Sequence, residues 1–356
     1  MMANGVFQTT LEISPRSRYD AIDVRARIVE TYGDVLEDFK KVLYCSHHTT
    51  AGYLDQQLAH RLHDRRDEVD PYIRKFQALF PLGAGYRHDE LEMRSELNDE
   101  ERRAEPPNGD AHLTFISSGL QSCVTYDHRT GVPVFFMDLD GVYRGTPRHR
   151  TTSIVAYDRE ERVADRVAEV PVSRHAIDSV NLGDERIGLS QQIDDLLSAH
   201  PVENGRLDIS LDPAEQAAGV TVNEYETLLM RYDLTDVLDN PLRFVARQGV
   251  RMLQNPRAVP AKSLGYARYD VVRVINRLID ATGLSNTAIE SFLTRLMAIP
   301  ASRRLRFKRR LSLPVALNPA GHGKIVTGRY QSPILIQWAR APRQVRTLHL
   351  SLSRFS

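Results

Sequence analysis

The chain has 356 residues, and its 47 Lys and Arg residues nearly balance its 46 Asp and Glu residues. The length predicts about two globular domains, and the balanced charge excludes a general attraction to nucleic acid or membranes. Two cysteines are too few for a disulfide framework, so we interpret them as small buried residues of a cytosolic protein. No signal peptide or membrane span is predicted, because the apolar runs are too short.

The first half predicts a strand, a helix, a second strand and more helices, followed by further strands. Asp20 is the expected N-cap of its first helix, and Pro71 is expected to break the second. A charged segment, residues 90–107, predicts an exposed or mobile loop. The charged segment 158–165 predicts a connector between domains. The expected strands are residues 7–14, 41–46, 111–118, 122–128, 131–142 and 148–157, and the expected helices are residues 19–39 and 57–80.

The second half begins with a similar order of elements. It predicts a strand at residues 166–174, a helix at 187–200 and a strand at 205–211. A long helical section follows at residues 240–299, and the chain ends in strands. These final strands are expected at residues 303–317, 323–330, 332–339 and 345–352.

Both halves share details beyond the order of elements. An Ala-Gly pair follows the central strand of each half, at residues 51–52 and 218–219, and a Pro-Arg pair precedes each final strand, at 147–148 and 342–343. We therefore predict a diverged tandem duplication of two domains, residues 1–160 and 165–356. The helical section, about residues 240–300, would enlarge the second copy.

Histidines are the candidates for chemistry in the first half. His47 and His48 are adjacent, and a strand turns successive side chains to opposite faces, so only one of them is expected to face a pocket. His88 and His112 each lie near acidic residues. Such residues suit a metal site or a general acid–base cluster, but with 12 histidines in the chain, scattered surface or capping histidines are the simpler explanation of spacing this wide.

Several short motifs of the first half resemble the YjbQ family, which is credited with a secondary thiamine-phosphate synthase activity. They are "LEISPRSR" near the start, "HTTAG" at residues 48–52, "YRH" at 86–88, "DAH" at 110–112 and "PRHR" at 147–150. The resemblance covers most of residues 6–157. It implies an α+β fold in which each domain is a largely antiparallel sheet or sandwich with packed helices. It also implies a homo-oligomer with a trimer-like arrangement of domains.

The resemblance also implies a set of site residues. Catalytic roles would belong to His48, His88, Asp110 and His112, and a divalent metal of unspecified identity would be held by His48, His88 and His112. No organic cofactor is predicted. Contacts to a phosphorylated ligand would come from Arg87, Arg148, Arg150 and Thr49.

The chain departs from the family at complementary places in its halves. The family's Asn-Glu pair is replaced by Gln56-Gln57 in the first half, whereas the second half keeps Asn223-Glu224. In the second half, Glu215 stands at the place of His48. Two explanations stay open: a composite site in which Glu224 joins the first-half cluster, or a site in the first copy alone.

The function implied by the resemblance is binding of a phosphorylated small molecule, with transferase chemistry of the thiamine-phosphate synthase type. A non-catalytic interaction protein derived from the enzyme fold is the alternative, so the sequence leaves enzymatic activity open. A weaker alternative is nucleic-acid binding through the basic residues 303–310. It is disfavoured because Leu305 and Phe307 alternate with the charges, as in an amphipathic edge strand.

Overall fold

The structure is a computed structural model that describes residues 2–3, 5–95, 97–239, 305–317 and 323–356. The chain divides into two compact units: unit 1 contains Met1–Pro71, Phe115–Tyr225 and Phe307–Ser356, and unit 2 contains Tyr72–Thr114 and Glu226–Arg306. Both predicted halves contribute to unit 1, so their status as two domains stays a prediction. The predicted helical section 240–299 lies outside the described residues.

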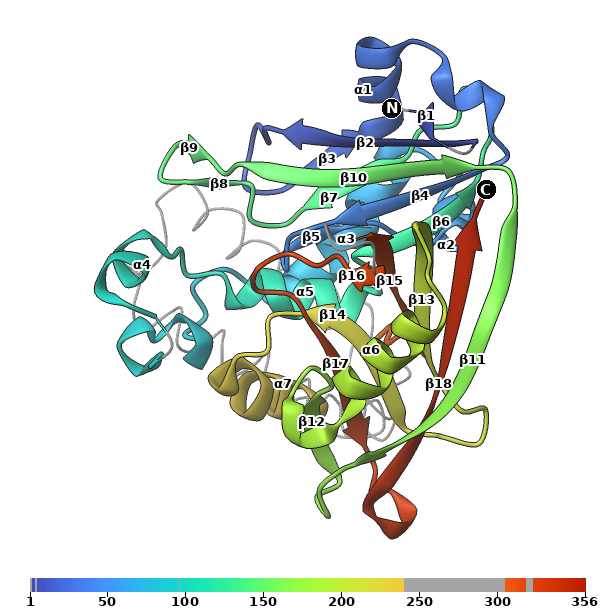
Figure 1. Ribbon diagram of the computed structural model, residues 1–356. Coiled ribbons are helices and arrows are strands. Elements are labelled where there is room, and N and C mark those ends of the chain that lie inside the picture. Colours follow the sequence, from blue (N-terminus) through green and yellow to red (C-terminus); the bar gives the residue numbers. More distant parts are fainter. Residues whose placement is uncertain (1, 4, 96, 240–304, 318–322) are drawn as a thin grey trace, which may run out of the picture. The chain divides into compact units, whose positions relative to one another are not determined.

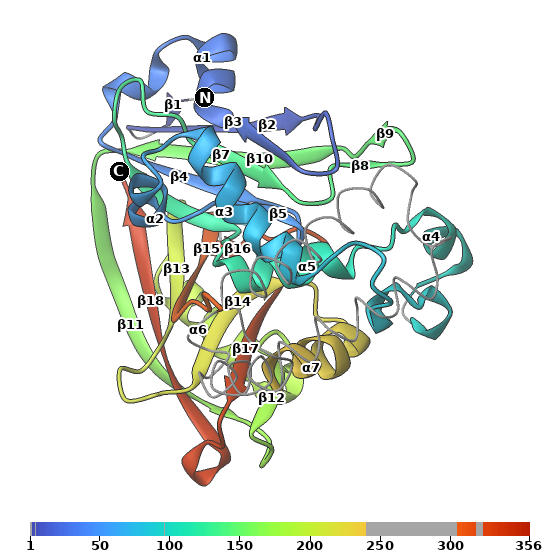
Figure 2. The same cartoon turned by 180° about the vertical axis from the view of Figure 1, so that it is seen from behind.

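The strands of the first half form two antiparallel sheets in unit 1 (Figure 1). The larger sheet has the order β1-β2-β10-β4-β6 and the smaller one the order β3-β7-β5. Leu11 of β2, Tyr44 of β4 and Phe136 of β7 belong to one buried cluster, so the two sheets enclose a common core (Figure 2). The strands are β1 (Met2–Ala3), β2 (Val6–Ile13), β3 (Asp20–Asp23), β4 (Lys41–Ser46), β5 (Ala51–Gly52), β6 (Cys123–Asp127), β7 (Phe135–Asp138), β8 (Val142–Tyr143), β9 (Thr146–Pro147) and β10 (Arg150–Tyr157).

The strands of the second half form another such pair of sheets in unit 1. Their orders are β11-β18-β13-β15-β16 and β12-β17-β14. Leu207 of β13, Leu335 of β17 and Leu196 of helix α6 share one buried cluster. The strands are β11 (Glu160–Pro171), β12 (Ile177–Asn181), β13 (Asn204–Leu211), β14 (Ala218–Asn223), β15 (Arg310–Leu317), β16 (Gly323–Ile325), β17 (Ser332–Trp338) and β18 (Val345–Phe355).

The two pairs of sheets correspond in seven strands each, leaving out β1 and β16. The order β2-β10-β4-β6 in the first half matches β11-β18-β13-β15 in the second, with chain order preserved. The order β3-β7-β5 matches β12-β17-β14 in the same way. The described part of the chain is therefore an α+β protein of antiparallel sheets, as predicted.

Short helices connect the strands and make up most of the described part of unit 2. Among the described residues, no helix is long and apolar enough to cross a membrane. The helices are α1 (Val24–Tyr32), η1 (Val35–Asp38), α2 (Gln56–Arg61), α3 (Arg66–Leu79), η2 (Arg87–Asp89), η3 (Leu91–Met93), α4 (Asp99–Ala104), α5 (Gly109–Ser118), η4 (Glu185–Ile187), α6 (Leu189–Ala199), η5 (Leu229–Asp233), α7 (Leu234–Asp239) and η7 (Pro342–Gln344).

Residues 111–118 were predicted as a strand, and this prediction is wrong: they belong to helix α5. Every residue of α5 is buried, so the helix has no polar face that would show the helical period. A short, wholly buried apolar run does not distinguish a helix from a strand.

Two predicted helix boundaries are also wrong. Helix α1 is capped by Asp23, whose side chain accepts hydrogen bonds from two backbone N–H groups, whereas Asp20 lies in β3. Pro71 lies inside α3 rather than at a break. The break falls earlier, where His63 and Asp64 adopt left-handed φ values of 57° and 53°.

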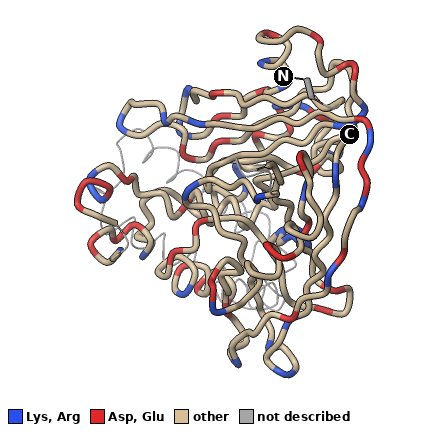
Figure 3. Tube along the Cα trace, viewed as in Figure 1, with Lys and Arg blue, Asp and Glu red and all other residues tan. Residues whose placement is uncertain are grey.

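The connector predicted at residues 158–165 is largely strand, because β11 begins at Glu160 and pairs with β18 along its length. Glu161, Asp165 and Glu169 are exposed, whereas Ala168 and Val170 are buried. Figure 3 shows the mixed charges along this strand. The prediction was misled because the charged residues on the solvent face of this half-buried strand look, in the sequence, like those of a linker.

The segment predicted as an exposed loop, residues 90–107, is only partly exposed. Helix α4 has no buried residue and begins with a complete capping box at Asn98. Arg94 and Leu97, however, are buried at 1% and 8% exposure. Arg94, which lies in this segment of unit 2, is therefore one of the few fully buried arginines among the described residues.

Candidate functional site

The predicted site residues are distributed over both units of the structure. Unit 2 contains Arg87, His88, Asp110 and His112, and unit 1 contains His48, Thr49, Arg148, Arg150 and Glu224. The assembly of all of them into one cluster stays a prediction.

In unit 2, His88 lies in the short helix η2, which Asp233 anchors. The carboxylate of Asp233 accepts hydrogen bonds from the backbone N–H groups of Arg87 and His88, both at 3.0 Å. Burial raises the pKa of Asp233 to about 6, although these hydrogen bonds oppose the rise. The backbone of His88 is thus fixed, and its side chain is 1% exposed.

The imidazole of His88 has polar partners on both ring nitrogens. Its Nδ1 lies 3.3 Å from Glu226 Oε2, and its Nε2 lies 3.0 Å from Asn108 Oδ1 and 3.4 Å from a guanidinium nitrogen of Arg94. Burial alone would raise the pKa of Glu226, but the hydrogen bond from His88 and two from backbone N–H groups hold it below the usual value. An ionised carboxylate on Nδ1 orients the ring, while Asn108 and Arg94 contact Nε2.

His112 lies beside His88 in unit 2. Its side chain comes from helix α5, is fully buried, and its ring centroid is 4.8 Å from that of His88. Asp110 of the same helix is 7% exposed. Burial raises the pKa of Asp89 to about 7, with His88 lowering it and Asp110 raising it further. Unit 2 therefore places two buried imidazoles among several carboxyl groups, which suits metal binding or acid–base chemistry.

In unit 1, His47 and His48 follow the end of β4 at Ser46, so strand alternation does not govern them. The Nε2 atom of His48 accepts a hydrogen bond from the Thr151 N–H at 2.8 Å. Burial, and then the nearby Arg150, lowers the pKa of His48 to about 3. The Nε2 atom of His47 lies 2.7 Å from the hydroxyl of Ser153. Both histidines contact β10, and His48 is a neutral acceptor.

The arginines of the "PRHR" motif are paired with acids. Arg150 is 3% exposed and donates two hydrogen bonds to Asp138, at 2.7 and 2.9 Å, and one to Thr50. Burial raises the pKa of Asp138, and Arg150 opposes the rise. Arg148 forms an ion pair with the buried Asp140. The predicted role of these arginines as anion contacts stays a prediction.

Second-half residues hold the backbone that carries His48. The Gln331 amide donates to the carbonyls of Ser46 and His48, at 3.0 and 3.1 Å. The Asn223 amide donates to the carbonyl of Thr49 at 2.7 Å. Gln331 and Asn223, the latter from the Asn-Glu pair that resembles the family, therefore fix a first-half segment within unit 1.

Glu215 has the same backbone contact in the second half that His48 has in the first. Its Oε1 accepts a hydrogen bond from the Thr347 N–H at 2.8 Å, as His48 accepts from Thr151. Its Oε2 pairs with Arg346 at 2.7 Å. The sequence prediction that Glu215 stands at the place of His48 agrees with this geometry.

His88, His112 and Glu224 carry side chains of the types that bind metal ions. The two histidines belong to unit 2 and Glu224 to unit 1. Their joint use as ligands therefore enters below as a proposal.

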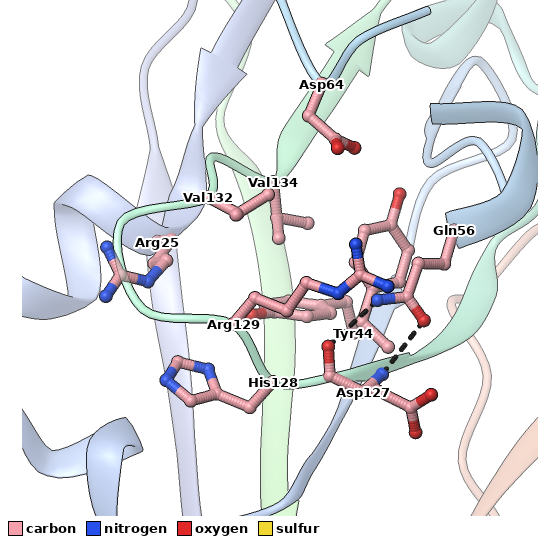
Figure 4. A pocket seen from close by; sticks show the side chains of 10 residues that line it. Arg25, Tyr44, Gln56, Asp64, Asp127, His128, Arg129, Val132 and Val134 are labelled. Atoms are coloured by element: carbon pink, nitrogen blue, oxygen red, sulfur yellow. Dashed lines mark hydrogen bonds between the residues drawn. The ribbon is translucent and has the colours of Figure 1, made fainter. Parts of the chain in front are cut away.

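A separate pocket in unit 1 contains none of the predicted site residues (Figure 4). Its Gln56 stands where the family has the Asn of its Asn-Glu pair. The Gln56 amide donates to the Asp127 carbonyl at 2.9 Å and accepts from the Asp127 N–H at 3.0 Å, so it ties α2 to β6. The pocket is lined by Arg25, Tyr44, Gln56, Asp64, Tyr126, Asp127, His128, Arg129, Val132 and Val134.

Sequence reasoning missed four partners of His88, namely Glu226, Asp233, Asn108 and Arg94. The signal available was weak: Glu226 and Asp233 flank the mostly apolar segment "TLLMRY", where buried carboxylates need partners.

The chain is thus an α+β protein of antiparallel sheets with a buried histidine–carboxylate cluster in unit 2. Among solved structures it is similar to a YbjQ-like protein of unknown function from Sulfolobus solfataricus, with 15% identity over 55% of this chain and 99% of that chain and a TM-score of 0.29. It is also similar to an uncharacterized YjbQ/UPF0047 family protein from Clostridium acetobutylicum, with 16% identity over 41% of this chain and 97% of that chain and a TM-score of 0.28.

This structural similarity to YjbQ/UPF0047 proteins covers about half of the chain. TM-scores this low carry no information about the site or about the second half. No protein-family profile matches the chain, and no curated protein matches it.

Proposed function

We propose that the chain binds a phosphorylated small molecule at a divalent-metal centre and acts as a transferase of the thiamine-phosphate synthase type. The observation that carries the proposal is the buried His88–His112 pair in unit 2, with Glu226 on the Nδ1 atom of His88. Buried imidazoles and carboxyl groups cost free energy unless they pair or bind a ligand. Such clusters of perturbed groups are typical of functional sites.

The residues fit a borderline divalent metal, for which imidazole and carboxylate are suitable ligands. His88 and His112 would hold it, with Glu224 as the third ligand of the composite site and Glu226 orienting His88 from behind. A bound metal would neutralise charge on a diphosphate leaving group. Arg87, which is exposed and lies 4.9 Å above the Tyr232 ring, would contact a phosphate.

We also propose that the two halves are diverged copies of one ancestral domain. The matching strand orders and the shared backbone contact of His48 and Glu215 support this. The contacts of Gln331 and Asn223 with residues 46–49 favour a second copy that takes part in the site rather than a detached partner. The trimer-like assembly stays a prediction.

Metal binding is the first test. Thermal unfolding of the full chain is followed with Mn²⁺, Zn²⁺ or Mg²⁺, and at least one metal is expected to raise the melting temperature. His88→Gln and His112→Gln should remove this rise, whereas His60→Gln, at an exposed histidine, should keep it. A rise that survives both substitutions would place the metal elsewhere.

The Glu224→Gln variant separates the two explanations of the site. A composite centre predicts weaker metal binding, because an amide is a poor cation ligand. Unchanged metal affinity would reject Glu224 as a ligand and leave the site to the first copy.

Turnover is the second test. The full chain is mixed with a pyrimidine-methyl diphosphate and a thiazole phosphate, and released pyrophosphate is measured with and without the metal that binds. Metal binding without turnover would favour the non-catalytic alternative, in which the pocket is kept without the reaction. The pairing of Arg148 and Arg150 with Asp140 and Asp138 supports that alternative.

Nucleic-acid binding through residues 303–310 is the weaker candidate. Within unit 1, Lys308 pairs with Asp55, and Arg310 pairs with Asp208 at 3.3 Å. Arg309 donates to backbone carbonyls. These contacts favour a structural role, and affinity for DNA or RNA that did not fall steeply with salt would end the nucleic-acid hypothesis.

A further inference from the structure

Cys45 and Cys123 lie directly opposite each other on neighbouring strands of unit 1. They are register partners in the antiparallel pair β4·β6. The next pair along, Ser46 and Ser122, is joined by a backbone hydrogen bond of 2.7 Å. The two cysteines therefore occupy a non-hydrogen-bonded position, where the Cα atoms approach to roughly 4.5 Å and the side chains are closest.

This position matches what a disulfide requires. Disulfides span Cα distances of about 4.4–6.8 Å, and a non-hydrogen-bonded pair falls at the short end of that range. The two sulfur atoms are already 2.9 Å apart, although both cysteines are free thiols. Closing the bond therefore needs rotation of the two side chains, without a change of register or an approach of the strands.

The surroundings keep the Cys45 thiol protonated and both cysteines out of water. Cys45 and Cys123 are 1% and 2% exposed, and the cluster around them includes Val155, Tyr157 and Phe355. Burial raises the pKa of the Cys45 thiol, and the hydrogen bond with Cys123 raises it further. Reaction with bulky disulfide reagents would need the strands to open, and the raised pKa slows oxidation of the Cys45 thiol because the thiolate is the reactive form, so a small oxidant in excess is the suitable partner.

We propose that Cys45 and Cys123 form a redox site that closes into a cross-strand disulfide when the protein reacts with hydrogen peroxide. One thiol is first oxidised by the peroxide to a sulfenic acid, with release of one water molecule. The other thiol then attacks that sulfur; the S–O bond breaks, and the hydroxyl leaves with a proton as a second water. Two electrons pass from the two sulfur atoms to the peroxide.

The bond would join β4 to β6 one residue before the hydrogen bond at Ser46, and two residues before His47. It joins two residues that are 78 positions apart in the chain, and a loop of this length strongly lowers the conformational entropy of the unfolded state. The disulfide uses no atom of the proposed metal centre. Its measurable effect is therefore on the stability of the first-half sheets, independent of whether the proposed transferase activity exists.

The test uses the full chain, reduced and then treated with hydrogen peroxide. The product is denatured, alkylated and weighed by mass spectrometry. We expect a loss of two hydrogens, no alkylation, a linked peptide containing Cys45 and Cys123, and a rise in melting temperature of about 5 °C. A thiol reductant should reverse all four changes.

The control variants are Cys45→Ser and Cys123→Ser, each of which removes one partner with little change in size. Neither should gain peroxide-dependent stability, and their melting temperatures without peroxide show whether they fold. Two alkylatable thiols in the treated wild-type chain, or separate oxidation of each cysteine without a link, would overturn the proposal.

Discussion

At the scale of single residues, unit 1 satisfies one backbone donor with different side chains in its two halves. The N–H of Thr151 is accepted by His48, and that of Thr347 by Glu215. An imidazole can accept there only while its Nε2 is deprotonated. The contact of His48 is consequently lost when its Nε2 is protonated.

His48 should therefore contribute to acid destabilisation. Its pKa is about 3 in the folded chain, whereas an unfolded chain protonates histidine near pH 6.5. The unfolded state then binds more protons between these values, so stability is complete above pH 6.5 and falls toward pH 3, by up to about 1.4 kcal/mol per pH unit. His48→Gln keeps an acceptor and should flatten urea-derived stability between pH 4 and 6.5. Parallel curves for variant and wild type would contradict this.

Gly328 is a residue whose lack of a side chain is essential. A Cβ at this position would lie 1.9 Å from the carbonyl oxygen of His47. That oxygen belongs to the backbone, so it cannot move away as a flexible side chain could. Gly328→Ala is expected to destabilise the chain by about 2 kcal/mol or more in urea unfolding. The matched control is Gly323→Ala, where the nearest atoms are 3.5 Å away, and a similar loss there would show that the clash is not the cause.

At the scale of elements, the start of helix α1 illustrates how one side chain joins a helix to a sheet. Asp23 ends β3 and caps α1 by accepting from the N–H groups of Arg25 and Ala26, at 3.0 and 3.2 Å. It also accepts from the Val134 N–H, just before β7, at 3.3 Å. One carboxylate thus fixes the helix against the strand that pairs with β3.

Asp23→Ala should cost about 1–2 kcal/mol, because three backbone donors lose their partner. The change is measured as the free energy of unfolding in urea at pH 7. Asp34, which precedes η1 and makes no capping hydrogen bond, provides the control as Asp34→Ala, with an expected loss below about 0.5 kcal/mol. Equal losses at the two positions would argue against the capping role.

At the scale of whole unit 1, the two halves share a core as well as polar contacts. The rings of Tyr157 and Phe355 stack with centroids 3.8 Å apart and an angle of 6° between planes. Arg206 of β13 pairs with Glu160 and donates to Thr125 of β6. The first-half and second-half sheets of unit 1 should therefore unfold together.

Phe355→Ala should lower the stability of both halves, by about 3–5 kcal/mol, because it leaves a cavity over Tyr157 and the buried cysteines. Hydrogen exchange of β4 and β13 reports on each half separately. Faster exchange in β13 alone would show that the halves unfold independently. Val167→Ala on β11, at a side chain that is 59% exposed, should have an effect below about 1 kcal/mol.

Strands were predictable wherever one face is buried, as in β2, where alternation is visible in the sequence. The buried helix α5 and the first, charged part of β11, residues 160–165, were not, because neither shows the period of its class. For the site, the sequence named His88 and His112. It did not reveal Glu226 or Asp233, which reach His88 from 138 and 145 positions away. Such pairing depends on tertiary packing and not on spacing.

The stack of Phe355 on Tyr157 also bears on the order in which the protein is made. Strand β18 leaves the ribosome after every other described strand, yet it lies between β11 and β13 and covers the cysteine cluster of the first half. Until β18 arrives, β11 has no partner strand, and the apolar faces beneath it stay open to water. A nascent chain stalled before residue 345 would thus expose strand edges that chaperones bind or that aggregate.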